Sequence, residues 1–253
     1  MKFKLLLITL VFIIASGKDA FGQSEKSTIN RDKAKWIGYT KDNRPEKWST
    51  RDFVRNQPPM DINTWKPTKE LKAVQRKAHP SVLLRKSFSV TKEVESAEVA
   101  ICGLGLYELH LNGNKVGDRV LDPAQTSYDK RAFFVRHNVT KLLKENNGLG
   151  IMLGNGFYGQ NIAFWPGLNY GKPRAIMVLD INYKDGTSEQ IVTDKSWKAN
   201  NSPILFDNIF HGETYDARKE IKNWSSSNYT DTSWDAVELM KAPTTNLLEQ
   251  QLE

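Results

Sequence analysis

Cysteine is almost absent from this 253-residue chain, and long hydrophobic runs are absent after the first residues. The one cysteine, Cys102, cannot form an internal disulfide, and its place at the end of the apolar stretch 99–102 predicts a buried, inert thiol. The longest apolar run, Leu5–Ala15, is interrupted only by Thr9 and is too short to cross a bilayer as a mature helix. We therefore expect no mature transmembrane segment, and stability that comes from a packed core.

Motifs of several enzyme classes are also missing. The chain contains no Gly-x-Ser-x-Gly nucleophile elbow, no His-Glu-x-x-His pair and no Walker loop. Its four histidines are scattered, with no spacing that would gather three of them onto one metal ion. The sequence therefore offers none of these catalytic or metal-binding constellations.

The first residues have the pattern of a secretory signal peptide. Lys2 and Lys4 precede the apolar run, and the segment 20–22 places small residues at the two positions that a signal peptidase reads. We expect export to the periplasm or the extracellular space, with cleavage near Gly22; an uncleaved anchor is the alternative. Cleavage would lower the formal net charge from +7 to +5, a modest surplus interleaved with acids that does not indicate nucleic-acid binding.

The segment 103–118 predicts a β-hairpin almost residue by residue. Tyr107, Leu109 and Leu111 alternate with polar residues, which is the period of a strand with one buried face. Asn112-Gly113 supplies the positive backbone dihedrals of a tight turn, and we expect the returning strand to open at Val116. This pattern indicates a half-buried antiparallel sheet.

Short strands separated by turn residues continue after Pro80. One brief helical piece is predicted at 138–144, capped near Asn138 and stopped at Asn146-Asn147-Gly148. The distribution fits an all-β, jelly-roll-like sandwich better than βαβ units, which need long crossover helices. The predicted strands are 82–90, 96–103, 106–112, 131–137, 148–154, 174–183 and 189–193.

Four segments follow one another along the chain: the hairpin 103–118, Leu-Asp-Pro-Ala-Gln-Thr-Ser-Tyr-Asp-Lys-Arg at 121–131, Leu-Gly-Asn-Gly-Phe-Tyr at 153–158 and Gly-Glu-Thr-Tyr-Asp-Ala-Arg at 212–218. In this order they resemble the N-terminal β-sandwich domain of bacterial α-L-rhamnosidases, the enzymes that remove terminal L-rhamnose from plant glycans. The resemblance runs from Trp36-Ile37-Gly38 to the last residues. It implies that the catalytic acids belong to a helical (α/α)6 barrel that follows the sandwich, so we expect this chain alone to be inactive on rhamnosides.

We divide the chain accordingly into four parts. Residues 1–22 are the signal peptide, and 23–80 are a polar leader and an irregular extension with one short helix near 69–77. Residues 81–240 are the rhamnosidase-like β-sandwich. Residues 241–253 begin the connection to a further domain, because they end on a strand pattern without a turn, as in a truncated or fragmentary chain.

Two predicted loops carry the residue types that a sugar site needs. A sugar offers hydroxyl pairs to planar amides and carboxylates, and an apolar ring face to an aromatic side chain. The first loop runs from Gly154 to Trp165, and the second covers 206–216. The predicted carbohydrate-binding residues are Asn155, Tyr158, Trp165, Asp207, Asn208, Glu213 and Tyr215.

The resemblance also implies a metal, because some rhamnosidase sandwich domains bind L-rhamnose through a calcium ion. Asn155, Asp207 and Asn208 are the side chains expected near such an ion, which prefers oxygen ligands. Glu213 and Asp216 are the only closely spaced acids in an aromatic context, but Arg218 would lower a pKa that a catalytic acid needs raised. Three interpretations of these loops stay open: contact with a rhamnose-containing glycan or calcium, an interface with the catalytic barrel, or turn structure alone.

Overall fold

The computed structural model describes residues 29, 32–39, 60–61, 63–64, 66–67, 80–159, 170–210 and 212–251. The predicted signal peptide, the helix near 69–77 and Trp165 lie outside these residues. In the described part no helix is long and apolar enough to cross a membrane.

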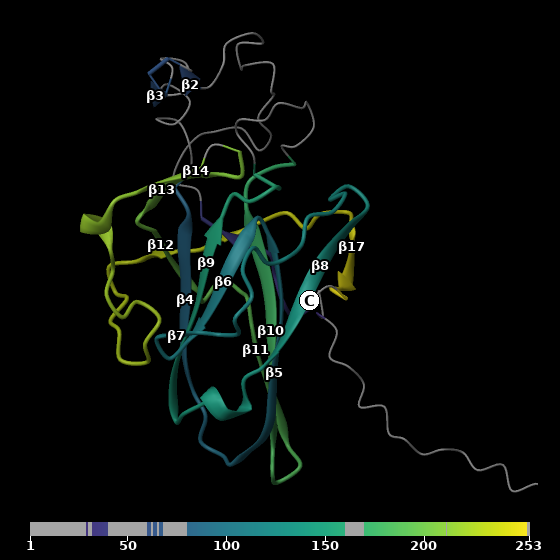
Figure 1. The fold of residues 1–253 in the computed structure, drawn as a ribbon. Helices are drawn as coiled ribbons and strands as arrows, with labels where there is room; N and C mark the ends of the chain where they lie inside the picture. The colour runs from purple at the N-terminus through teal and green to yellow at the C-terminus, as the bar shows by residue number, and fades with distance from the viewer. Residues whose placement is uncertain are drawn as a thin grey trace, which may run out of the picture.

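Two β-sheets face each other and confirm the predicted all-β sandwich (Figure 1). The seven-stranded sheet has the order β16-β1-β10-β5-β8-β17, with β11 also paired to β10. Its strands are β1 (Ile37–Gly38), β5 (Val94–Leu104), β8 (Arg131–Asn138), β10 (Arg174–Tyr183), β11 (Ser188–Val192), β16 (Glu238–Leu239) and β17 (Asn246–Glu249).

The six-stranded sheet has the order β15-β12-β4-β9-β6-β7. Its strands are β4 (Val82–Ser89), β6 (Leu106–Leu111), β7 (Asn114–Lys115), β9 (Asn146–Gly154), β12 (Lys198–Asn201) and β15 (Asp235–Ala236). Two separate hairpins are β2 (Met60–Asp61) with β3 (Lys66–Pro67), and β13 (Ile204–Asn208) with β14 (Gly212–Tyr215).

The main hydrophobic core lies between the two sheets. One face of β5 and β10 supplies Ala97, Val99, Ile101, Met177 and Leu179, which pack against apolar residues of β4, β6 and β9. The opposite face of the same two strands is buried as well, under a second cluster. Burial on both faces explains their nearly continuous apolar sequence, and it confirms the prediction that the Cys102 thiol is buried.

The hairpin at 106–115 confirms the predicted turn and corrects the returning strand. Asn112 and Gly113 both have positive φ, at 54° and 87°, as a two-residue hairpin turn requires. The returning strand β7 is only Asn114–Lys115, so Val116 follows it rather than opening it. Val116 is nevertheless buried, and its N–H donates to the carbonyl of Leu109 at 2.8 Å.

The predicted helix at 138–144 is present only as a single 3-10 turn, η2 (Thr140–Leu142). Val139 is at its N-cap position and gives no side-chain cap, while the Oδ1 of the preceding Asn138 accepts the Thr140 N–H at 3.1 Å. A second 3-10 turn, η3 (Ala217–Lys219), follows β14. The segment 206–216, predicted as a loop, is instead mostly the β13–β14 hairpin.

Candidate functional site

The predicted ligand residues meet at one end of the sandwich, where β9 ends beside the β13–β14 hairpin (Figure 1). Asn155 and Tyr158 lie in the turn after β9, and Asp207 and Asn208 are the last two residues of β13. Glu213 and Tyr215 belong to β14. The folded chain therefore brings the two predicted segments together.

The Asp207 carboxylate lies at the centre of the contacts at this end of the sandwich. Its two oxygens accept hydrogen bonds from three donors. Its Oδ1 accepts the backbone N–H of Asn155 at 2.8 Å. Its Oδ2 accepts the Asn155 side-chain amide at 2.8 Å and the Ser81 hydroxyl at 2.8 Å. We call Ser81, Asn155 and Asp207 the clasp, because their hydrogen bonds join the starts and ends of three strands. Ser81, 126 positions from Asp207, has no local sequence signal and was missed by the sequence analysis.

Several of the predicted contact residues are inside the protein. Asn155, Tyr158 and Asn208 are only 4%, 6% and 5% exposed. The Asn208 side chain also closes a local turn, since its Oδ1 accepts the Phe210 N–H at 2.9 Å. Glu213 and Tyr215 are exposed and Asp207 is partly exposed, so these are the described members of the set that a ligand could reach without movement.

Tyr158 belongs to an aromatic cluster on the outer face of the seven-stranded sheet. Its ring meets Tyr128 edge-on at a centroid distance of 5.3 Å and stacks on Tyr170 at 5.9 Å. The Arg174 guanidinium lies 6.0 Å from the Tyr158 ring centre. Burial raises the pKa of the Tyr128 hydroxyl above its ordinary value. These contacts give Tyr158 a packing role in the second hydrophobic cluster.

Protein donors use both oxygens of the Asp207 carboxylate, so a calcium ion here would have to share these oxygens or displace the hydrogen bonds. Calcium takes six to eight oxygen ligands, often including carboxylates, whereas here both oxygens of one carboxylate already accept protein N–H and O–H groups. Within the described ranges, no group of three or more His, Cys, Asp or Glu side chains could hold a metal ion. Asn155 points its amide N–H, not its oxygen, at Asp207.

Asp216, one of the two acids of the second segment, is unsuited to act as the general acid of glycoside hydrolysis. Arg218 forms an ion pair with Asp216 at 2.8 Å, and this hydrogen-bonded pair lowers the pKa of Asp216. A general acid needs the opposite shift. Asp216 also accepts the Arg218 N–H at 3.2 Å and caps η3. The pairing of Asp216 with Arg218 is therefore structural.

We expect Asp207→Ala to lower the free energy of unfolding by about 2 kcal/mol, because the buried donors of Asn155 lose their acceptor. The loss should be the same with a chelator present, since the contacts are between protein groups. Urea unfolding followed by circular dichroism measures it, with Asp207→Asn as the control that keeps the shape and one acceptor. A loss that appears only with calcium would contradict this role.

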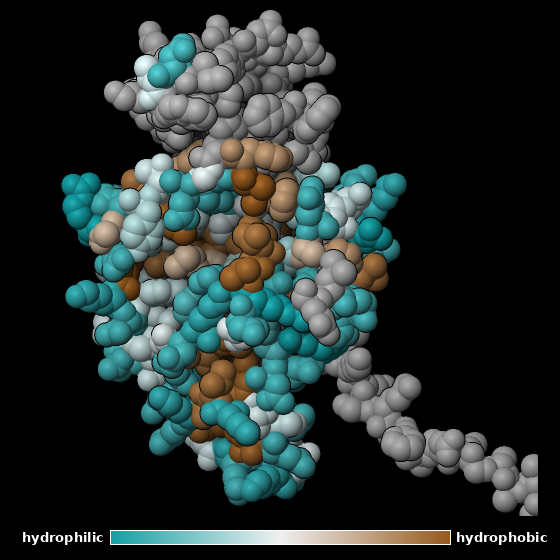
Figure 2. Space-filling view, viewed as in Figure 1, coloured by the Kyte–Doolittle hydropathy of each residue, from teal (hydrophilic) through white to brown (hydrophobic). Residues whose placement is uncertain are grey.

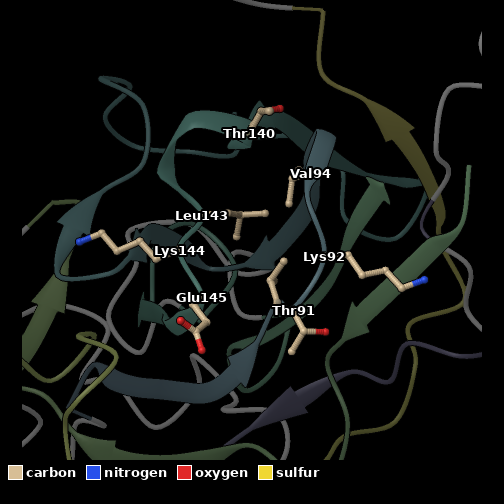
Figure 3. Close-up of a pocket in the computed structure, with 8 residues that line it drawn as sticks. Thr91, Lys92, Val94, Thr140, Leu143, Lys144 and Glu145 are labelled. Carbon is tan, nitrogen blue, oxygen red and sulfur yellow. The ribbon is translucent and has the colours of Figure 1, made fainter. Parts of the chain in front are cut away.

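A cavity of about 460 Å³ lies elsewhere, beside η2 and the β4–β5 turn (Figure 3). Val94 and Leu143 point into it, while the Lys92 and Lys144 side chains extend away on opposite sides. Lys92 donates to the Asp185 carboxylate at 2.8 Å. None of the predicted ligand residues lines this cavity.

Tyr107 and His137 form another pair of titratable groups, with Tyr107 Oη 3.4 Å from His137 Nε2. Burial lowers the pKa of His137 below its ordinary value of 6.5. The unfolded state therefore binds more protons than the folded state, so His137 favours folding above about pH 6.5 and this contribution is lost as the pH falls.

We expect the urea midpoint of the native chain to fall between pH 7.5 and pH 5.5 more steeply than that of His137→Gln, which cannot take up this proton. Parallel urea titrations at three pH values test the difference in slope. Equal slopes for the two proteins would contradict the assignment.

Residues 92–253 match the family described as the α-L-rhamnosidase N-terminal domain. An α-L-rhamnosidase of Formosa agariphila is 40% identical over 233 residues, which are 88% of this chain and 23% of that protein. One from Streptomyces avermitilis is 38% identical over 58% of this chain and 14% of its own length. The chain thus spans about a quarter or less of the curated relatives that it matches.

This chain is also similar to a part of solved α-L-rhamnosidase structures. The α-L-rhamnosidase of Dictyoglumus thermophilum superimposes with a TM-score of 0.68 and 33% identity, covering 88% of this chain and 23% of that chain. The Streptomyces avermitilis α-L-rhamnosidase complexed with L-rhamnose gives a TM-score of 0.64 and 36% identity, covering 66% of this chain and 17% of that chain.

Proposed function

Because this chain belongs to the family of α-L-rhamnosidase N-terminal domains, we propose that it is an accessory module of an exported α-L-rhamnosidase, acting on rhamnose-containing glycans through a separate catalytic domain. The N-terminal pattern of Lys2, Lys4 and the apolar run supports export. The small share of each relative that the chain covers supports a catalytic region elsewhere. Its own role is to hold that region rather than to bind a sugar.

One observation favours a structural role over calcium-dependent sugar binding. The polar side chains at the end of the sandwich form hydrogen bonds within the protein. Asp207 accepts three hydrogen bonds from Ser81 and Asn155. Asn155 and Asn208 are almost fully buried. Side chains committed in this way brace loops, whereas a sugar site needs accessible hydrogen-bonding groups.

A second candidate function is weak glycan binding on the outer surface of the β13–β14 hairpin. Phe210 and Tyr215 are 45% and 47% exposed, and Glu213 is exposed beside them in β14. An aromatic face with a nearby carboxylate is the combination that a pyranose recognises. Tyr215 also donates to the Glu220 carboxylate, which raises the pKa of Tyr215 and orients its ring.

Calorimetric titration of residues 23–253 with L-rhamnose, with and without calcium, separates these roles. For a chain shown to be folded by circular dichroism, we expect no saturable heat at millimolar sugar. Binding that survives a chelator but is lost in Phe210→Ala/Tyr215→Ala would establish the hairpin surface. Binding that a chelator abolishes would restore the calcium site and overturn the structural role.

A further inference from the structure

Three strongly exposed apolar side chains belong to neighbouring segments of the sandwich. The viewed surface is mostly hydrophilic, with hydrophobic side chains gathered in a few patches (Figure 2). Val120 and Leu121 are 74% and 64% exposed in the segment that leads to β8, and Leu248 is 46% exposed in β17. We call these three residues the β17 patch. Such side chains are unfavourable in contact with water unless a partner covers them.

The Gln250 side chain joins the two segments of the patch. Its Oε1 accepts the Ala124 N–H at 2.8 Å, and its Nε2 donates to Asp122 Oδ1 at 3.2 Å. Leu248 and Gln250 are two positions apart along an extended strand, so both point to the same side. Leu248 therefore lies on the side of β17 that faces the 120–124 segment.

The backbone presents Leu121 outward in a conformation that leucine rarely adopts. Its φ is +60°, in the left-handed region that disfavours a residue with a branched side chain. The following residue is held in place, because the Asp122 carbonyl accepts the Tyr107 N–H at 2.9 Å. An exposed leucine that neighbouring contacts hold in a strained backbone conformation indicates a position with a function.

The strand β17 is equally well fixed. It pairs in parallel with β8, and the Gln250 N–H donates to the Phe134 carbonyl at 2.9 Å. Arg136 binds the Glu249 carboxylate at 3.2 Å and the Glu98 carboxylate at 2.7 Å. Among the described strands, β17 ends the order of the seven-stranded sheet. β17 lies at one edge of the sandwich (Figure 1), so the patch belongs to a fixed part of that edge.

We propose that the β17 patch is the docking surface for the polypeptide that follows this domain in the longer α-L-rhamnosidases. The inference rests on the proposed accessory function and names its contact residues. The matched family domain is N-terminal by description, and the Formosa agariphila relative devotes only 23% of its length to the match. Residues 246–251 run along the patch itself, so a polypeptide continuing from them would leave the sandwich beside it.

The test is a fusion of this full chain to the part of the Formosa agariphila relative that lies C-terminal to its matched region, with a protease site at the junction. After cleavage, size-exclusion chromatography reports whether the two parts stay together. The patch variant carries Val120→Ser, Leu121→Asn and Leu248→Thr. The matched control carries Leu142→Ser and Leu239→Thr, which change leucines exposed by 38% and 57% at other places.

We expect the native and control fusions to co-elute after cleavage and the patch variant to separate. Co-elution of all three would overturn the β17 patch while leaving the accessory function in place. Separation of all three would overturn the accessory function itself. Self-association of the isolated native chain that the patch substitutions abolish would assign the surface to a second copy and overturn the proposal.

Misfolding does not imitate the expected result. Asparagine tolerates the positive φ of position 121 better than leucine does, and threonine suits a strand position such as 248. The patch variant should therefore keep the thermal unfolding midpoint of the native chain within about 2 °C, since surface changes of this kind have small effects. If the patch variant separates and its unfolding midpoint falls further than this, the cleavage experiment is repeated with Leu248→Thr alone. Co-elution of that variant, with a native unfolding midpoint, would count against the patch.

Discussion

Replacing Asp231 by alanine is expected to lower the free energy of unfolding by about 3 kcal/mol, because it leaves a buried guanidinium without its counter-ion. Arg85 is fully buried in β4, with its side chain 1% exposed, and it forms an ion pair with Asp231, which is 26% exposed. Its remaining acceptors are neutral: Ser87 Oγ at 3.0 Å and the Ser226 carbonyl at 3.1 Å. The Tyr229 ring lies 5.1 Å away.

Thermal unfolding should show the loss as a midpoint lower by roughly 6–12 °C. The double variant Arg85→Met/Asp231→Ala removes the buried charge with its partner, so it should recover more than half of the loss. Glu93→Ala is the matched control, since it breaks an ion pair with Lys184 whose side chains are 72% and 58% exposed. That control should change stability by less than about 1 kcal/mol. A double variant no better than Asp231→Ala would show that the charge is not the cause.

Local patterns were sufficient for most of the sandwich. Alternation of apolar residues and turn chemistry predicted the seven strands from β4 to β11 that are longer than two residues, each within about two positions at either end. β5 and β10 were found because burial on both faces leaves a continuous apolar sequence. The turn at Asn112-Gly113 was found because only a few residues accept its positive φ values.

Long-range pairing explains what local patterns missed. β17 pairs in parallel with β8, with Asn246 opposite Arg131, although more than a hundred residues separate the two strands in sequence. The four residues of β17 contain no pattern that predicts which strand it pairs with. The β13–β14 hairpin pairs only with itself in the described topology, and its polar sequence resembled a loop.

Contacts between residues far apart in the sequence were also missed at the predicted site. The Asn155 and Asp207 segments were selected because amides and carboxylates beside aromatic residues are what a sugar site needs, and the fold brings the two segments together. It could not show that Ser81 and the Asn155 amide would occupy the Asp207 oxygens. Likewise, the alternating pattern of its strand suggests that Arg85 points outward to solvent. The structure shows that the segment 221–234 covers it.

The second large effect concerns that covering segment, which lies directly on glycines of β9. A Cβ atom at Gly148 would lie 2.4 Å from the carbonyl carbon of Ser226 and 2.6 Å from the Ser225 carbonyl oxygen. A Cβ atom at Gly150 would lie 2.4 Å from the Trp224 ring. In the sheet register Gly150 is opposite Arg85, so the same closely packed layer also covers the buried ion pair.

We therefore expect Gly148→Ala to lower the free energy of unfolding by about 3 kcal/mol, the upper range for overpacking, because the clash is with backbone. The sign itself is informative, since glycine to alanine in an unhindered strand stabilises by roughly 0.5–1 kcal/mol. Gly150→Ala should cost about 2 kcal/mol in the native chain. Urea unfolding followed by tryptophan fluorescence measures both.

Trp224 provides the decisive comparison, because one clash is with its side chain and the other is not. In a Trp224→Ala background, Gly150→Ala should lose most of its cost and keep only the part due to Ser225 Cβ at 2.9 Å, whereas Gly148→Ala should keep its full cost. Gly113→Asn is the control in an open turn, where no atom lies within 4 Å and φ is +87°, a value that asparagine tolerates. Equal costs for the two alanine substitutions in both backgrounds would mean that the segment 221–234 does not rest on β9, and the burial of Arg85 beneath it would lose its physical basis.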